Sequence, residues 1–171
     1  HGIEVLKSKL DLSKMMDRKN KIVNQLTSGV SGLFKANKVT SITGEARILG
    51  STQVEVSFDG KSQVISTKHV IIATGSSPID IPVASVDQEN IVNSTGALAF
   101  NSVPKKLVII GAGAIGLELG SIWARLGSEV TVLEAMDEFL PMADKRIARE
   151  VLRELKKQGL EIYLGCKVTS T

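Results

Sequence analysis

Three glycines and one glutamate carry the clearest chemical signal in this sequence. Gly111, Gly113 and Gly116 follow an apolar run, and Glu134 comes roughly 20 residues after the first glycine, at the end of a second apolar run. Between a strand and a helix, the first glycine permits a tight turn, the second lets the backbone approach a pyrophosphate, and the third lets the helix pack on the strand. The pattern predicts a dinucleotide site. The alternative is a doubly wound sheet without a ligand, which explains Gly116 by packing but not Gly113 together with Glu134.

The residues after the second glycine are expected to open a helix. Ala114 and Ile115 would lie in its first turn, where N–H groups without intrahelical acceptors and the positive end of the helix dipole favour phosphates. The Glu134 carboxylate would accept a hydrogen bond from the free 2′-hydroxyl of an adenosine ribose and would repel a 2′-phosphate. No cation stands at residues 135–138 to offset that charge, so the sequence favours NAD over NADP.

A scaffold of three strands and two helices would position these groups. Residues 107–110 predict a central, buried parallel strand, and residues 129–133 and 160–164 predict the next two strands. Before the last strand, residues 144–158 have the helical period, and Gly159 ends that helix. The side chains expected to face inward from it are Ile147, Val151, Leu152 and Leu155. This order of elements is one mononucleotide-binding half of a Rossmann-type fold.

The first part of the chain opens with a predicted long helix. Apolar residues recur at spacings of three and four through residues 11–36, which is the period of one helical face. Asp11 or Ser13 can cap its start, whereas Gly29 and Gly32 weaken it and indicate a bend or close packing.

An antiparallel meander is predicted to follow this helix. Short, partly alternating strands are expected at residues 39–42, 46–49, 53–58 and 63–66. Asp59-Gly60 is a strong hairpin signal between the last two. An apolar strand is expected at residues 69–73, and residues 78–104 are interpreted as a connection between two domains.

Composition narrows the classes of function. The chain has 171 residues, of which 43% are hydrophobic and 23% charged, as in globular proteins. The net charge of +3 is small and forms no concentrated basic block, so no nucleic-acid partner is expected. No membrane segment, leader peptide or metal site is predicted either. The single cysteine, Cys166, excludes an internal disulfide and suits a reducing compartment.

Several motifs match one known family closely. They are residues 33–39 at the predicted helix end, 71–76, 94–98, and 109–121, which contain the glycine turn. On these motifs the chain resembles the dihydrolipoamide (dihydrolipoyl) dehydrogenases of the class I pyridine nucleotide-disulfide oxidoreductase family, over essentially its whole length. The resemblance implies a three-layer, FAD/NAD(P)-binding Rossmann-like α/β fold with an antiparallel β-meander. It places residues 1–103 in the later part of an FAD-binding domain and residues 104–171 in the first half of an NAD-binding domain.

The resemblance also implies a reaction and its cofactors. The family oxidises a protein-bound dihydrolipoyl group and passes the electrons through a redox disulfide to FAD and then to NAD. The partners implied are the lipoyl domains of 2-oxo acid dehydrogenase complexes and a second copy in a homodimer. The compartment implied is the bacterial cytoplasm or the mitochondrial matrix.

Residue roles carry over at matching positions. Glu118 would lie near the flavin ring and pair with a lysine beside the redox cysteines; the alternative is an ordinary charged residue on a helix. The residues expected to lie along FAD are Gly44, Glu45, Ala46, Thr74, Gly75 and Ser76. Plain turn chemistry is the alternative for the Thr-Gly-Ser segment. The residues expected at NAD are Gly111, Gly113, Ala114, Ile115, Gly116 and Glu134.

The chain also departs from the family pattern. It has no glycine fingerprint for the FAD pyrophosphate, no closely spaced pair of cysteines and no counterpart of the family's C-terminal His–Glu pair, which His1 and His69 do not match. It also begins at His1 rather than Met. We therefore expect a central fragment with incomplete domains, inactive alone although its parent is an enzyme. The alternatives are a non-catalytic NAD-binding fragment, an inactive proteolytic product, and a fragment of a sibling such as mercuric reductase, glutathione reductase or NADH oxidase. Glu134 disfavours the NADP-linked siblings.

Overall fold

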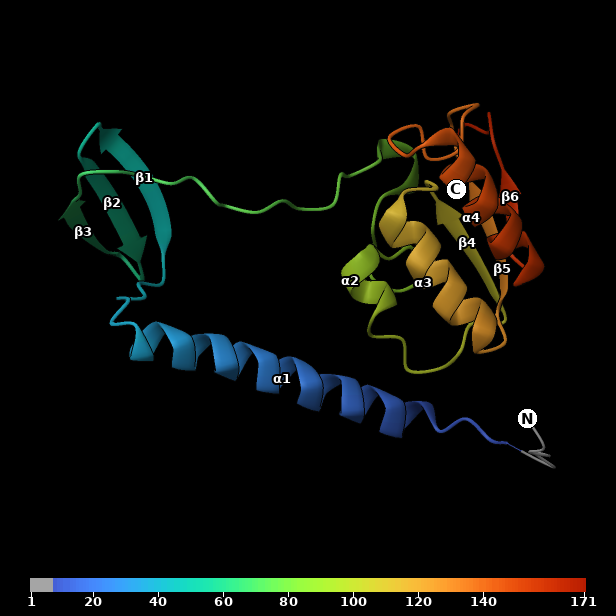
Figure 1. Cartoon of the computed structure of the whole chain (residues 1–171), viewed down its shortest axis with the longest axis horizontal. Coiled ribbons are helices and arrows are strands. Elements are labelled where there is room, and N and C mark those ends of the chain that lie inside the picture. The colour runs from blue at the N-terminus through green and yellow to red at the C-terminus, as the bar shows by residue number, and fades with distance from the viewer. Residues whose placement is uncertain (1–7) are drawn as a thin grey trace. The chain divides into compact units, whose positions relative to one another are not determined.

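The computed structural model describes residues 8–171 and divides the chain into two compact units. One unit is residues 18–77, and the other includes residues 78–171. Each unit is described by itself below (Figure 1). Within residues 8–171, no helix combines the length and the apolarity needed to cross a lipid bilayer.

α1 (Leu12–Ala36) is the long helix that the sequence predicted. Of the two candidate caps, Asp11 is the one observed, because its carboxylate accepts a hydrogen bond from the Lys14 N–H at 3.1 Å. A Cβ added at Gly29 or Gly32 would meet nothing within 4 Å. The close packing considered for these two glycines is therefore not found in the part of the chain that the structure describes.

The end of α1 explains why the strand predicted at residues 39–42 is wrong. The Val39 N–H donates to the Phe34 carbonyl at 2.9 Å, and the N–H of Lys38, which has a φ of 57°, donates to the Lys35 carbonyl at 3.2 Å. This is a Schellman motif, in which the last helix carbonyls accept from the N–H groups that follow. The N–H of Val39, the first residue of the expected strand, is thus bonded to the helix end, and the segment forms no strand.

Three antiparallel strands form the predicted meander. β1 (Glu45–Gly50) pairs with β2 (Gln53–Phe58), and β2 pairs with β3 (Lys61–Ser66). Asp59 and Gly60 join β2 to β3 with φ values of 48° and 71°. Two positive φ values in a two-residue loop define the type I′ hairpin that the Asp-Gly pair favours, so the hairpin prediction is confirmed.

The apolar run at residues 69–73, which was also predicted to be a strand, is not one. No strand within residues 8–171 pairs with it, and Ile71 and Ile72 are 89% and 73% exposed. An apolar run becomes a strand only where a neighbouring strand takes up its N–H and C=O groups. Composition cannot reveal whether that neighbour is present.

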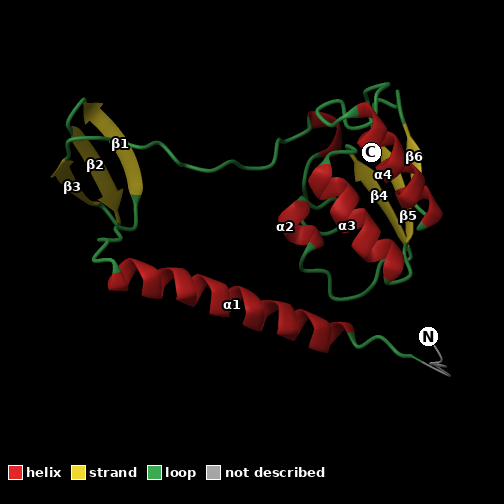
Figure 2. Cartoon of the chain, viewed as in Figure 1, coloured by secondary structure: helices red, strands yellow, loops and turns green. Residues whose placement is uncertain are grey.

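A parallel sheet of three strands organises the second unit (Figure 2). β4 (Lys106–Ile110), β5 (Glu129–Leu133) and β6 (Glu161–Tyr163) lie in that order, all parallel. α3 (Ala114–Arg125) connects β4 to β5, and α4 (Lys145–Lys157) connects β5 to β6. This is the predicted strand–helix–strand–helix–strand order, and the fold class is a partial Rossmann-like α/β fold.

β4 is parallel as predicted, but among the described strands it is an edge strand and β5 is central. Leu107 and Ile109 are half-buried, whereas Val108 and Ile110 are 60% and 38% exposed. A run of four apolar residues fits a strand covered on both faces. In the described chain, the face of β4 that carries Ile109 is partly covered by α3, and the opposite face is exposed.

The core of this unit lies between the sheet and its helices. α4 contributes Ala148 and Leu155 to it, with Val151 and Leu152 half-buried. Ile147, which was predicted to face inward, is 60% exposed, so that prediction is wrong. The buried positions follow the spacing i, i+3, i+4, i+7, and Ile147 lies one residue outside that stripe although its side chain is larger than alanine.

Two short helices lie within the segment predicted as a connection: η1 (Pro82–Ala84) and α2 (Ser94–Ala97). The Trp123 indole N–H donates to the Ala97 carbonyl at 3.2 Å, and the Phe100 ring lies 5.2 Å from the Trp123 ring. Because Trp123 belongs to α3 and is 2% exposed, these contacts fasten the segment around α2 to the second unit. The division into domains at residue 104 stays a prediction.

Candidate nucleotide-binding site

The glycine turn lies between the end of β4 and the start of α3. Gly111 has a φ of 101°, a conformation that side-chain-bearing residues rarely adopt. A Cβ on Gly116 would lie 2.6 Å from the Gly111 carbonyl oxygen and 3.1 Å from Ile109 Cγ2. The fold itself therefore requires glycine at both positions, as the sequence predicted for turn and packing.

Gly113 is different, because nothing in the described chain requires glycine there. Its φ and ψ are −75° and 171°, which any residue can adopt. A Cβ added at Gly113 would meet no atom within 4 Å. A glycine with ordinary dihedrals and open space around its missing side chain leaves room for something outside the chain to approach the backbone.

The first turn of α3 offers free hydrogen-bond donors. Gly113 is its N-cap, and within residues 8–171 no side chain caps the N–H groups of the first turn, which include those of Ala114 and Ile115. By contrast, α4 is capped by the Asp144 carboxylate, which accepts from the Arg146 N–H at 2.9 Å. The uncapped start of α3, with the positive end of its dipole, suits an anion such as phosphate.

Glu134 lies against this turn, directly after β5. Its Oε2 accepts a hydrogen bond from the Ala112 N–H at 2.8 Å, and its Oε1 accepts from the Met136 N–H at 2.9 Å. The Glu134 N–H donates to the Tyr163 carbonyl at 2.9 Å, and its carbonyl accepts from the Cys166 N–H at 2.8 Å. The structure thus brings the predicted glycines and the predicted carboxylate together. Sequence reasoning missed Ala112 and Met136 because they act through backbone N–H groups, which side-chain type does not signal.

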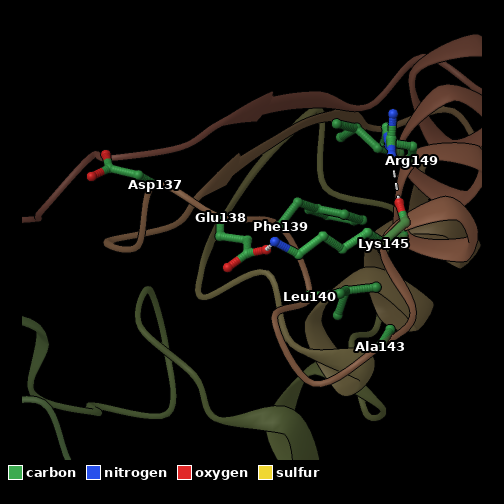
Figure 3. Close-up of a pocket in the computed structure, with 9 residues that line it drawn as sticks. Asp137, Glu138, Phe139, Leu140, Ala143, Lys145 and Arg149 are labelled. Atoms are coloured by element: carbon green, nitrogen blue, oxygen red, sulfur yellow. Dashed lines mark hydrogen bonds and ion pairs between the residues drawn. The ribbon is translucent and has the colours of Figure 1, made fainter.

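A cavity of about 270 Å³ lies beyond Glu134, between the loop after β5 and the first turns of α4. Figure 3 shows the Glu138 carboxylate and the Lys145 amine meeting beside the Phe139 ring, with N–O at 3.5 Å. The Arg149 Nε–H donates to the Lys145 carbonyl at 3.1 Å. No residue of the glycine turn lines this cavity.

Glu118 is exposed on α3, one turn beyond the glycines. It lines a hollow of about 450 Å³ between α3 and α4, together with Ser121 and Arg125. The Ser121 hydroxyl donates to Gln158 Oε1 at 2.7 Å. Glu118 is therefore accessible and has no role in the core of this unit.

Comparison with known proteins decides the family. A model of the pyridine nucleotide-disulphide oxidoreductases matches residues 3–171. The chain belongs to this family. FAD and NAD are cofactors of its members, as the sequence predicted.

The relatives are mostly dihydrolipoyl dehydrogenases. The mitochondrial dihydrolipoyl dehydrogenase of Pisum sativum is 47% identical over 98% of this chain and 34% of its own length. The dihydrolipoyl dehydrogenase of Cupriavidus necator is 48% identical over 98% of this chain and 35% of its own. A leghemoglobin reductase of Vigna unguiculata is 47% identical over 98% of this chain and 32% of its own. The chain thus spans about a third of the length of these curated relatives.

Solved structures share the fold. The HOCl-induced flavoprotein disulfide reductase RclA of Escherichia coli superposes with a TM-score of 0.76 at 30% identity, over 94% of this chain and 37% of that one. LpdA of Mycobacterium tuberculosis superposes with a TM-score of 0.84 at 23% identity, over 95% and 37%. These likenesses extend over both described units of this chain.

The residues predicted to lie along FAD are all exposed and all belong to the 18–77 unit. Gly44, with Glu45 and Ala46, stands at the start of β1. A Cβ on Gly44 would lie 2.6 Å from the Ser57 carbonyl oxygen, so the meander alone already requires this glycine. The FAD role of these three residues stays a prediction.

Thr74, Gly75 and Ser76 lie in the extended segment after β3, where Gly75 has a φ of 74°. Within residues 8–171, no hydrogen bond joins this segment to the start of β1. Their contact with FAD also stays a prediction.

Proposed function

We propose that this chain is part of an NAD-linked flavin disulfide oxidoreductase of the dihydrolipoyl dehydrogenase type. Residues 104–171 form the first half of its NAD-binding domain, and residues 1–103 belong to the later part of its FAD-binding domain. The single observation that carries the nucleotide site is Gly113, a glycine that the fold does not need, at the open N-terminus of α3. In this proposal the N–H groups of Ala114 and Ile115 hold the NAD pyrophosphate.

The carboxylate of Glu134 selects NAD over NADP. It lies next to the glycine turn, where an adenosine ribose is held in proteins with this motif. A free 2′-hydroxyl can donate a hydrogen bond to it, whereas a 2′-phosphate would meet its negative charge. Residues 135–138 contain no cation that could offset this repulsion.

The parent reaction balances as a two-electron transfer. A dihydrolipoyl dithiol is oxidised to the lipoyl disulfide while NAD is reduced to NADH, with one proton released. When bound, FAD would supply the two-electron redox chemistry that links the redox disulfide to NAD. In this chain Glu118 supports the flavin region from the surface of α3, and the two FAD-side segments, residues 44–46 and 74–76, offer backbone groups to FAD.

The assembly of the parent is proposed on the same basis. Its substrates are lipoyl domains of 2-oxo acid dehydrogenase complexes, it acts as a homodimer, and it works in the bacterial cytoplasm or the mitochondrial matrix. Relatives named as mitochondrial and a relative from the bacterium Cupriavidus necator support this assignment.

A substitution at Gly113 tests the nucleotide site. Gly113→Ala should leave the free energy of unfolding within about 0.5 kcal/mol of wild type, because the added methyl meets no atom. It should lower NAD affinity by about tenfold or more, because the methyl occupies the space the pyrophosphate needs. Isothermal calorimetry with NAD and with NADP measures both affinity and preference. Equal NAD binding by Gly113→Ala, or tighter binding of NADP than NAD by wild type, would refute the assignment.

A non-catalytic nucleotide-binding role is the second candidate. It is favoured by the single cysteine, since 171 residues with one thiol cannot form a redox disulfide within the chain. An assay of lipoamide-dependent NADH formation with added FAD distinguishes a catalytic chain from one that only binds a nucleotide. We expect no turnover by the 171-residue chain and turnover only by a longer polypeptide that carries it.

A further inference from the structure

The Glu134 carboxylate makes two contacts that recognition of a ribose does not require. Its two oxygens accept hydrogen bonds from the backbone N–H groups of Ala112 and Met136, at 2.8 and 2.9 Å. Ala112 is only 3% exposed, so water cannot readily replace a lost partner of its N–H. The carboxylate therefore satisfies a buried donor of the glycine turn in the absence of any ligand.

Glu134 is itself fixed by the sheet. Its N–H donates to the Tyr163 carbonyl and its carbonyl accepts from the Cys166 N–H, which joins it to the β6 side. The glycine turn is tied to this anchored end of β5 at two successive points. The Gly111 N–H donates to the Leu133 carbonyl at 2.8 Å, and the Ala112 N–H donates to Glu134 Oε2.

We infer that Glu134 is a positioning residue that holds the glycine turn in its binding geometry before a nucleotide arrives. As far as the nucleotide is concerned, this inference rests on the proposed function. Each carboxylate oxygen offers about two lone-pair sites. One site on each oxygen is used by the backbone, and the other remains for the hydroxyls of a ribose. Fixing the turn in advance removes its ordering cost from nucleotide binding.

The two roles of the Glu134 side chain, toward the glycine turn and toward the ribose, limit how cofactor preference can be changed by substitution. Replacing Glu134 with a cation removes the repulsion of a 2′-phosphate, but it also removes the acceptor of the buried Ala112 N–H. The glycine turn then loses one of its two ties to β5. A change of preference to NADP therefore requires a second substitution that supplies an acceptor to Ala112.

The test compares Glu134→Gln with Glu129→Gln in the full chain. A glutamine has one acceptor oxygen, so it cannot accept from both backbone N–H groups, and its NH₂ group opposes the second donor. Glu129 begins β5, the strand that Glu134 follows, its side chain is 78% exposed, and its only ion pair among the described residues, to Lys106, is 3.9 Å long. The control thus removes the same charge from β5 without touching the turn.

Amide exchange without nucleotide is the first measurement. Glu134→Gln should speed exchange at Ala112, at Met136 or at both by about tenfold, the loss expected for a hydrogen bond to a charged group. The amides of α4 should keep their wild-type rates in both variants. Wild-type exchange at Ala112 and Met136 in Glu134→Gln would overturn the positioning role.

The second measurement separates the turn from the ribose. Calorimetry uses NAD and an NAD analogue whose adenosine ribose lacks both the 2′- and the 3′-hydroxyl. If Glu134 positions the turn, Glu134→Gln lowers affinity for the analogue by about tenfold, and Glu129→Gln does not. If it acts only on the ribose, affinity for the analogue is unchanged, which overturns the inference and leaves the proposed function intact. If no form binds NAD, the proposed function fails, and the exchange result alone decides the positioning role.

Glu134→Asp keeps the test decisive should the glutamine variant unfold. The shorter side chain can still accept from the N–H two residues ahead, as aspartate commonly does, but it cannot reach Ala112. We expect faster exchange at Ala112 with Met136 still protected. Retained protection at Ala112 in this variant would contradict the inference.

Discussion

Replacing Gly116 with alanine should weaken the second unit without any involvement of ligand. The new Cβ would lie 2.6 Å from the Gly111 carbonyl oxygen and 3.1 Å from Ile109 Cγ2. The carbonyl cannot simply turn away, because Gly111 is held at a φ of 101° and its N–H is bonded to Leu133. The start of α3 must therefore move away from β4.

Two opposing terms set the size of the effect. Alanine in a helix is about 1 kcal/mol more favourable than glycine. Restoring an ordinary contact of 3.4 Å requires a shift of about 0.8 Å, and overpacking of this kind typically costs about 1–3 kcal/mol. Because the closest atom is a fixed backbone carbonyl oxygen, the upper part of that cost applies, about 2–3 kcal/mol, and the helix preference for alanine reduces the net loss in the free energy of unfolding to about 1–2 kcal/mol. Gly120→Ala is the matched control, because its closest contact is Ile109 Cδ1 at 2.9 Å, the movable end of a side chain.

Urea denaturation followed by tryptophan fluorescence provides the assay. Trp123 is the single tryptophan of the sequence, lies on α3 and is 2% exposed, so its emission reports on this unit. With a slope of about 1–2 kcal/mol per molar urea, Gly116→Ala should lower the midpoint by roughly 1 M, and Gly120→Ala should stay close to wild type. The steric reasoning fails if Gly116→Ala is as stable as wild type, or if both variants lose the same stability.

Three further outcomes follow from other contacts. Gly44→Ala should loosen the meander by about 2 kcal/mol or more, because its Cβ would strike a carbonyl of β2. Faster amide exchange in β2, with unchanged tryptophan-monitored unfolding, would bear this out, and wild-type exchange would contradict it. Asp144→Ala should cost about 1 kcal/mol through loss of the α4 cap, and Asp144→Asn, which keeps an acceptor, should cost less. The Ile91 N–H, with two neighbouring N–H groups, lowers the pKa of Asp87. The hydrogen bonds to the Asp87 carboxylate should therefore be complete above the ordinary carboxyl pKa and should be lost only as the pH falls through the lowered pKa. An NMR titration that shows an ordinary pKa for Asp87 would contradict this.

Local patterns predicted most of the second unit. β5 was expected at residues 129–133 and is observed at Glu129–Leu133, because alternating apolar residues and flanking polar ones are sufficient to define a strand with two partners. The glycine turn and Glu134 were expected to form one dinucleotide site on motif and spacing, and they do lie together, since each follows a parallel strand and the two strands end at the same edge of the sheet. Their roles toward NAD remain predictions.

The wrong predictions concern properties that a short stretch of sequence does not contain. Residues 39–42 and 69–73 have the composition of strands, but one donates its first N–H to a helix end and the other has no partner in the described chain. Ile147 was expected to face inward as an apolar residue of an amphipathic helix, whereas the structure buries Ala148 and exposes Ile147. The acceptor that fastens Ala112 depends on tertiary contact between backbone and side chain, which residue type does not encode.

The exposed pair Ile71 and Ile72 has a consequence for handling the chain. A short, uncharged, β-branched run that pairs with no strand in the described chain is the kind of segment from which intermolecular cross-β pairing begins. Lys68 on one side and Pro78 on the other are residues that oppose such growth. We therefore expect Ile71→Lys to raise the solubility of the chain more than substitutions of exposed residues on α4 do.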